Sequence, residues 1–115
     1  MSTFADYSGA AYDVRMTQGD TFSEQILMED SDGSAIDITG YSFASQLRRT
    51  ADDSLVAQFS IGVDVPNSTV TRILNPAVTG NLEGIYVHDF QWTDPQGRVR
   101  TLFSGEFEIE PEVTR

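Results

Sequence analysis

The chain has 115 residues, with seven arginines, no lysine, no cysteine and eighteen acidic residues, and its formal net charge is −11. This length suits one domain, and an apolar content of 39% is enough for a core without disulfides or structural metal. The acidic charge argues against nucleic acid and anionic membranes as partners, because both attract clustered basic side chains. The absence of cysteine excludes a disulfide scaffold, a thiol nucleophile and a cysteine-based zinc site.

Apolar and polar residues alternate along most of the chain, which predicts β-strands joined by turns. In chain order, the expected strands are 11–17, 21–29, 41–50, 55–63, 68–74, 84–93 and the segment from 98 onward. In the second of these, Glu24 interrupts the apolar side and indicates an edge or a bulge. In the fourth, the side chains expected to face the core are Leu55, Ala57, Phe59 and Ile61.

Turn residues separate the expected strands. The Asn-Pro pair at 75–76 fits the cap and first position of a single helical turn, and residues 94–97 fit a type I turn. Strands spaced about eight to twelve residues apart are typical of an immunoglobulin-like fold. The sequence therefore predicts an all-β fold, a single immunoglobulin-like antiparallel β-sandwich of about seven strands at residues 11–115, after a flexible N-terminal arm at residues 1–10.

Three aspartates, Asp30, Asp32 and Asp37, resemble part of a calcium-binding loop. The bidentate glutamate and the flanking helices of an EF-hand are missing, and the Asp-Gly pair at 32–33 is typical of a tight turn. We interpret the segment as a hairpin turn, with a weak surface cation site as the alternative. No other metal and no cofactor are expected.

The only histidine, His88, lies inside an expected strand, where its neighbour Asp89 points to the opposite face. A catalytic histidine needs a nucleophile and an orienting carboxylate within reach, so a packed or rim histidine is favoured. The sequence has no glycine-rich phosphate loop, nucleophile elbow or metal-ligand spacing. It predicts no catalytic residues and no enzymatic activity.

Aromatic residues concentrate near the carboxyl-terminal third of the chain. Tyr86, Phe90 and Trp92 share one side of an expected strand, and Phe103 follows on the return strand. We interpret them as core, and the segment 82–86 matches a tyrosine corner, which makes Tyr86 a fold-locking residue. Trp92 lies nearest the turn and is the one expected to reach the surface, where a sugar-stacking platform is the alternative.

The last expected strand carries glutamates that alternate with apolar residues, namely Glu106, Glu108, Glu110 and Glu112. Such alternation is typical of a solvated strand face, and four like charges on one face favour basic neighbours. The candidates are Arg48, Arg98 and Arg100 on adjacent strands, or a basic partner protein. In the arm, Phe4 and Tyr7 are further candidates for partner contact, unless the terminus is simply frayed.

Four segments, residues 19–22, 32–48, 82–90 and 93–99, resemble the immunoglobulin-like domains of tailed-bacteriophage structural proteins. The arrangement is similar over about residues 12–111, especially to the N-terminal domain of baseplate upper proteins that carry receptor-binding fibres. In that family this domain binds the baseplate and a longer carboxyl-terminal part binds the fibre or host. Because the sequence stops just after its last expected strand, the resemblance implies attachment or bridging.

Together these features predict a non-catalytic virion structural protein of the tail or baseplate, an adaptor that links the tail to a fibre or a neighbouring subunit. We expect partners among other virion proteins, in multiple symmetric copies, and synthesis in the host bacterial cytoplasm, since the polar start lacks signal-peptide features. The alternatives are a capsid decoration (cement) protein and a carbohydrate-binding module that uses Trp92. Copy number per particle and glycan binding discriminate between them.

Overall fold

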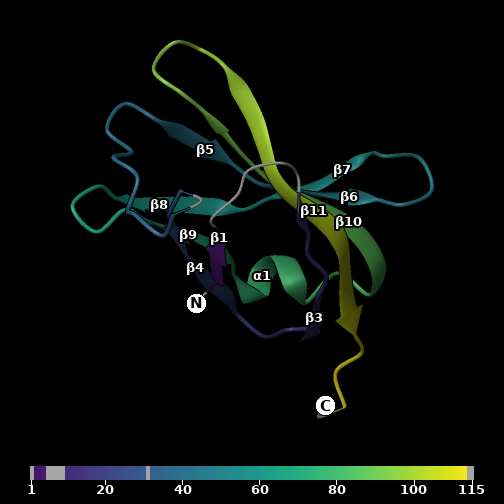
Figure 1. Ribbon diagram of the computed structural model, residues 1–115. Helices are drawn as coiled ribbons and strands as arrows, with labels where there is room; N and C mark the ends of the chain where they lie inside the picture. Colours follow the sequence, from purple (N-terminus) through teal and green to yellow (C-terminus); the bar gives the residue numbers. More distant parts are fainter. Residues whose placement is uncertain (1, 5–9, 31, 114–115) are drawn as a thin grey trace.

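The computed structural model describes residues 2–4, 10–30 and 32–113, and β-strands dominate it (Figure 1). Sheet A has the strand order β1 (Ser2–Phe4), β4 (Phe22–Met28), β9 (Thr69–Leu74) and β8 (Ser60–Asp64). Sheet B has the order β2 (Ala10–Ala11), β11 (Val99–Glu110), β10 (Gly84–Thr93), β6 (Gln46–Arg49) and β7 (Leu55–Gln58). In the same sheet, β3 (Val14–Thr17) lies beside β11 and β5 (Ser42–Ala44) beside β10.

The strand order is that of an immunoglobulin-like sandwich. In such domains strands B, E and D share one sheet, while G, F, C and C′ share the other. Here β4, β9 and β8 follow the first order, and β11, β10, β6 and β7 follow the second. The predicted all-β, immunoglobulin-like sandwich is confirmed.

The N-terminal strands pair in parallel with strands of sheets that are otherwise antiparallel. β1 runs parallel to β4, and both β2 and β3 run parallel to β11. From β4 onward every pair of neighbouring strands in the described residues is antiparallel. A parallel strand cannot be joined to its neighbour by a tight turn, so the hairpin signals that located the other strands do not reveal this pairing.

Each expected strand has a counterpart, but two of them are divided: the strand at 41–50 is β5 and β6, and the strand at 55–63 is β7 and β8. The chain leaves sheet B after β7 and enters sheet A at β8, and the buried Phe59 at the crossing donates its backbone N–H to the Ser45 carbonyl. The register of β6 against β7 shifts between Leu47 and Arg48, so Val56 is an extra residue and Leu55 stands opposite Arg48. Leu55 is therefore 48% exposed, and the prediction that it faces the core is wrong. Phe59 is buried and Ile61 is half-buried, as expected.

The core lies between the two sheets in two groups of buried apolar residues. One consists of Ile26, Met28, Ile38, Val70, Phe90, Leu102 and Phe103. The other consists of Leu47, Phe59, Leu74, Tyr86, Phe107 and Ile109. Trp92 is only half-buried and packs at the border of the first group, so the predicted placement of the aromatic residues is confirmed.

Two irregularities shape β11. Its register against β10 shifts between Phe90 and Gln91, so Leu102 is an extra residue, a β-bulge. The strand then ends at Glu110, because Pro111 has no backbone N–H to continue the ladder. The expected alternation through Glu112 is therefore wrong: the alternating strand stops before it.

The predicted turns are present. The Gly97 N–H donates to the Asp94 carbonyl, which closes the type I turn of the β10–β11 hairpin. The helical turn α1 (Pro76–Thr79) follows Asn75 at its N-cap position, although the Asn75 side chain makes no capping hydrogen bond. In the described part of the chain, no helix is long and apolar enough to cross a membrane.

The predicted N-terminal arm is described only in part. Ser2–Phe4 forms β1 and is paired in register with Ile26–Met28 of β4, and Ala10 belongs to β2. Tyr7, named above as a candidate for partner contact, lies outside the described residues.

Candidate functional site

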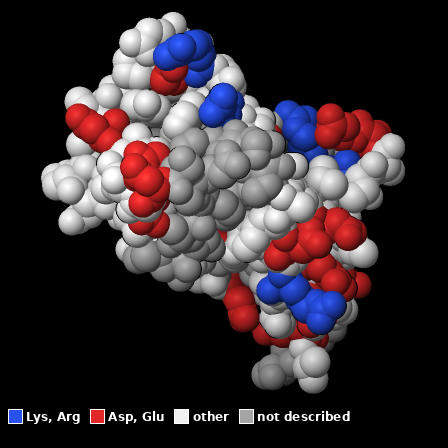
Figure 2. Space-filling model, in the orientation of Figure 1, with Lys and Arg blue, Asp and Glu red and all other residues white. Residues whose placement is uncertain are grey.

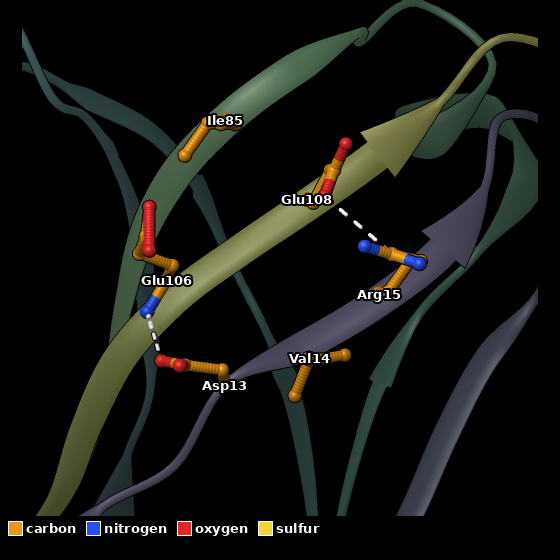
Figure 3. A pocket seen from close by; sticks show the side chains of 6 residues that line it. All are labelled: Asp13, Val14, Arg15, Ile85, Glu106 and Glu108. Atoms are coloured by element: carbon orange, nitrogen blue, oxygen red, sulfur yellow. Dashed lines mark hydrogen bonds and ion pairs between the residues drawn. The ribbon is translucent and has the colours of Figure 1, made fainter.

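The outer surface of sheet B carries the predicted glutamates (Figure 3). Glu106 and Glu108 alternate with the buried Phe107 and Ile109 on β11 and point away from the core. With Asp13, Val14, Arg15 and Ile85 they line a hollow of about 350 Å³. Three carboxylates therefore surround an apolar floor in which Ile85 is 50% exposed.

A second hollow of about 500 Å³ adjoins the first, because Asp13 and Glu106 line both. It extends across β10 to β6, where Val87 pairs with Arg48. Between the two hollows, the Asp13 carboxylate is held in place, because its Oδ1 accepts a hydrogen bond from the Glu106 N–H at 2.9 Å. We call the two hollows together the acidic face; their residues come from β10, β11, β6 and the chain around β3.

The basic neighbour of the glutamates is Arg15, not the arginines expected from the sequence. Arg15 Nε lies 3.5 Å from Glu108 Oε1 and 3.3 Å from Glu110 Oε1. This contact arises from the parallel pairing of β3 with β11, in which Arg15 stands opposite Glu108. Arg98 pairs with Asp94 instead.

The other two expected arginines do not pair with the glutamates either. Arg48 is separated from β11 by β10 and bonds to Gln46 and the Asp53 carbonyl. Arg100 stands opposite Trp92, at the far end of β11 from the glutamates. Glu112, beyond the end of the strand, lies beside Gly19 and its backbone N–H is 3.4 Å from Gln18 Oε1.

The acidic face has a surplus of negative charge. Its lining holds five carboxylates, those of Asp13, Asp53, Asp89, Glu106 and Glu108, against two guanidinium groups, those of Arg15 and Arg48. Figure 2 shows the acidic side chains gathered over the lower right of the view, over β11 and β3, with one basic group among them. Surface ion pairs of this kind stabilise a fold by less than about 1 kcal/mol, so the charge remains available to a basic partner.

Inside the sandwich lies a polar network that the sequence analysis missed. The fully buried Arg72 of β9 donates from Nε to Glu24 Oε1 at 2.7 Å, and the Tyr12 hydroxyl donates to the other oxygen of Glu24. Arg72 Nη1 donates to Ser45 Oγ at 3.1 Å and to His88 Nδ1 at 3.0 Å. Burial lowers the pKa of Arg72, and the Glu24 carboxylate partly offsets that effect.

Aromatic rings enclose the same guanidinium. Its Cζ lies 5.2, 4.7 and 4.8 Å from the ring centroids of Phe22, Phe59 and Phe103. Arg72 Nη2 is buried and has no hydrogen-bond partner among the described residues, so ring contacts replace hydrogen bonds on that side. The signal was present in the sequence: Glu24 and Arg72, of opposite charge, both interrupt the inward side of a strand. Glu24 therefore belongs to an internal ion pair. The expected edge or bulge is absent at this position, because β4 lies between β1 and β9 and its register against β9 has no shift.

His88 belongs to this network and is a packed histidine. Its Nδ1 accepts from Arg72, so Nε2 carries the proton and donates to the Tyr12 carbonyl at 2.7 Å. Burial, together with the nearby Arg72 guanidinium, lowers the pKa of His88 from 6.5 to about 4. Both ring nitrogens are thus engaged in holding the two sheets and the Tyr12 segment together.

This pKa predicts a pH-dependent stability. Between pH 6.5 and about 4 the unfolded chain binds a proton on His88 that the folded chain does not, so the free energy of unfolding falls as the pH is lowered through this window. The expected loss is about 3 kcal/mol. Urea unfolding across the window measures it, and His88→Gln, which cannot titrate, should show a shallower slope. Equal slopes in the two proteins would contradict the assignment.

Tyr86 lies at the start of β10 and contacts the loop before it. Its hydroxyl donates to the Glu83 carbonyl at 3.1 Å and accepts from the Glu83 N–H at 3.2 Å. A tyrosine that bonds back to the preceding loop is the contact of a tyrosine corner. Its role as a fold lock stays a prediction.

The aspartates of the 30–37 segment accept hydrogen bonds within their own turns. Asp30 Oδ1 accepts from the N–H groups of Asp32 and Ser34, and the Asp30 N–H donates to the Ser34 carbonyl. The Thr39 hydroxyl and N–H bond to Asp37 and lower the pKa of its carboxyl. These hydrogen bonds are those of a turn, as the hairpin-turn interpretation expects. In the part of the chain that the structure describes, no group of three or more metal-ligating side chains occurs.

No known family model matches the chain, and no curated protein matches it. The N-terminal domain of phage TP901-1 ORF48 matches with a TM-score of 0.56 and 12% identity, over 94% of this chain and 94% of that one. A phage protein domain shares this fold.

Two further structures are similar. CopC from Methylosinus trichosporium OB3b has a TM-score of 0.54 and 14% identity, and the match covers 100% of this chain and 99% of CopC. Murine CRIg has a TM-score of 0.43 and 14% identity, over 87% and 92% of the two chains. The phage domain and CopC share the sandwich with this chain over nearly their whole length.

Proposed function

We propose that this chain is a non-catalytic structural protein of a phage virion, an adaptor at the tail or baseplate that links the tail to a fibre or a neighbouring subunit. The observation that carries the proposal is the shared fold with the phage TP901-1 ORF48 domain, which extends over 94% of both chains. The sequence resemblance to tailed-phage domains, found in four segments, supports the same role.

The acidic face is the surface that best suits a partner. It combines an apolar floor, with Ile85 half exposed and Val87 half-buried, with a surplus of carboxylates at its border. An extended or helical segment with alternating basic and apolar side chains would complement both features, and charge complementarity would steer its approach. The partner we propose is therefore a basic segment of a neighbouring virion protein.

The proposal includes no catalysis. The single histidine has both ring nitrogens engaged inside the network. The carboxylates of Glu108 and Glu110 form ion pairs with Arg15, and the Asp13 carboxylate accepts a hydrogen bond from the Glu106 N–H. This arrangement suits recognition of positive charge.

Incorporation into particles tests the proposal. In virions produced by the genome that encodes this chain, quantitative mass spectrometry should detect the protein at a handful to a few dozen copies. The variant Glu106→Gln/Glu108→Gln should be incorporated several-fold less, because two charge contacts of about 0.5–1 kcal/mol each are lost. The control Asp20→Asn/Asp64→Asn changes the net charge equally at two exposed residues that line neither hollow, and Asp64 lies on β8 of sheet A.

The outcomes separate the function from the surface. Absence of the protein from purified virions would contradict the proposed function, and hundreds of copies per particle would favour a capsid decoration protein instead. Equal incorporation of both variants would be compatible with the virion role, but it would show that the glutamates form a solvated face and do not contact a basic partner.

A further inference from the structure

The end of the β10–β11 hairpin carries a third hollow, of different chemistry. It measures about 440 Å³ and is lined by Tyr41, Trp92, Asp94, Arg98, Val99 and Arg100. In Figure 2 basic side chains lie over this hairpin at the top of the view, away from the acidic face. In a chain of net charge −11, two arginines beside two aromatic rings form a distinct environment.

The strand register places these side chains on one surface. Trp92 stands opposite Phe43 on one side and Arg100 on the other, so the three occupy one row across β5, β10 and β11. Residues opposite one another in a sheet point to the same face of that sheet, so the Arg100 side chain lies on the same face as the Trp92 indole. The bulge at Leu102 sets this facing, because one extra residue moves the preceding part of β11 to the other side.

The hollow is held rigid by the turn beneath it. The Asp94 carboxylate, 10% exposed, accepts from the N–H groups of Gln96 and Arg98 and from Arg98 Nε at 2.8 Å. The contacts of Nε with Asp94 and of Nη2 with Gln96 Oε1, at 3.4 Å, position the guanidinium of Arg98, whose side chain is 77% exposed, and leave Nη1 for a ligand. An arginine held in this way loses little conformational freedom on binding.

Tyr41 is fixed against Trp92 from the other side. The two rings meet edge to face, with centroids 5.0 Å apart. The loop that carries Tyr41 packs on the hairpin turn at Gly40, where a Cβ atom would lie 3.2 Å from Pro95 Cγ. Both aromatic side chains are half-buried, so part of each ring contributes to the wall of the hollow.

We propose that this hollow binds an acidic saccharide unit. A pyranose presents apolar C–H groups that pack on aromatic rings, while a carboxylate on the sugar is matched by the planar donors of Arg98 and Arg100. Volumes of a few hundred Å³ are typical of small-ligand sites. The site is separate from the acidic face and does not depend on the virion role, since it is built within one chain.

The tryptophan provides a direct measurement, because Trp92 is the only one in the sequence. Titration of the full chain with an oligogalacturonate at up to millimolar concentration should change the Trp92 fluorescence in a saturable way. The matched neutral probe, an oligosaccharide of galactose, should bind at least about tenfold more weakly. Arg100→Gln should weaken oligogalacturonate binding by about tenfold, whereas the control Arg49→Gln, an equal charge change on the β6–β7 hairpin, should leave it unchanged.

Four results would overturn the proposal: unchanged fluorescence with oligogalacturonate, equal binding of the neutral oligosaccharide, an equal effect of the two arginine variants, or an equal response to poly-glutamate. The last would show a site for acidic peptides and not for sugars. Calorimetry on Trp92→Ala, whose fold is checked by circular dichroism, should show no heat of binding; retained binding would also contradict the assignment.

Discussion

Replacement of Arg72 by methionine is expected to destabilise the fold by about 3–5 kcal/mol, the largest effect that any of our substitutions should have. The reason lies in what remains: the Glu24 carboxylate, whose side chain is 9% exposed, would stay inside the sandwich without its 2.7 Å partner. Ser45 Oγ and His88 Nδ1 would also lose their donor. Because the free energy of unfolding of a native protein is about 5–15 kcal/mol, Arg72→Met should remove a large share of the total stability.

The matched variant for this prediction is Arg72→Met/Glu24→Gln. Without the buried charge, the second substitution should restore part of the lost stability, since an apolar group with a neutral neighbour can replace a buried ion pair at little cost. Equilibrium unfolding in guanidinium chloride gives the free energies of the two single variants and the double variant. If the double variant lost the sum of the two single effects, Glu24 and Arg72 would not act as a pair.

Gly105→Ala is expected to be the second most damaging change, at about 3 kcal/mol. An added Cβ would lie 2.3 Å from the Tyr12 carbonyl oxygen and 2.7 Å from Asp13 Oδ1. The segment that would have to move is the one that His88 Nε2 and the Glu106 N–H hold in place. A single methyl group should therefore disturb the buried network and the acidic face together.

Gly62→Ala is the control for this substitution. Gly62 lies on the edge strand β8, and an added Cβ there meets no atom within 4 Å. Its effect should be within about 0.5 kcal/mol of zero or slightly stabilising, because alanine restricts the unfolded chain. Thermal unfolding of both variants is sufficient; a melting temperature of Gly105→Ala equal to that of the parent would contradict the close approach of Tyr12.

Alternation along the sequence predicted most of the fold because one face of each strand is buried. Tyr86, His88 and Phe90 point inward from β10, and Phe107 and Ile109 from β11, as the period of two requires. The crossing at Phe59 was not predictable in this way, since a strand that changes sheets keeps its local alternation. The end of β11 before Glu112 was signalled by Pro111 and was misread.

Charge pairing was harder to predict than strand position. The partner of Glu108 and Glu110 is Arg15, which is more than ninety residues away in the chain and is brought near only by the parallel β3–β11 pair. Hairpin neighbours such as Arg98 were the natural expectation from sequence order. The pair of Glu24 and Arg72 is another long-range contact, and only the coincidence of opposite charges at two inward positions pointed to it.

The two proposed surfaces depend on the same scaffold in different ways. The acidic face is built on β10, β11, β6 and the Tyr12–Arg15 segment, which the buried network fixes through His88. The aromatic-arginine hollow is built on the hairpin end, which Asp94 fixes. Because they share none of their lining residues, a partner protein and a saccharide could be bound at the same time.

A density map of the purified virion is the most direct test of the proposed role. The account predicts density for this sandwich at the tail or baseplate, with the acidic face covered by a basic segment of a neighbouring protein. Density for the sandwich on the capsid surface only, or no density for it in a map that resolves the complete tail, would contradict it.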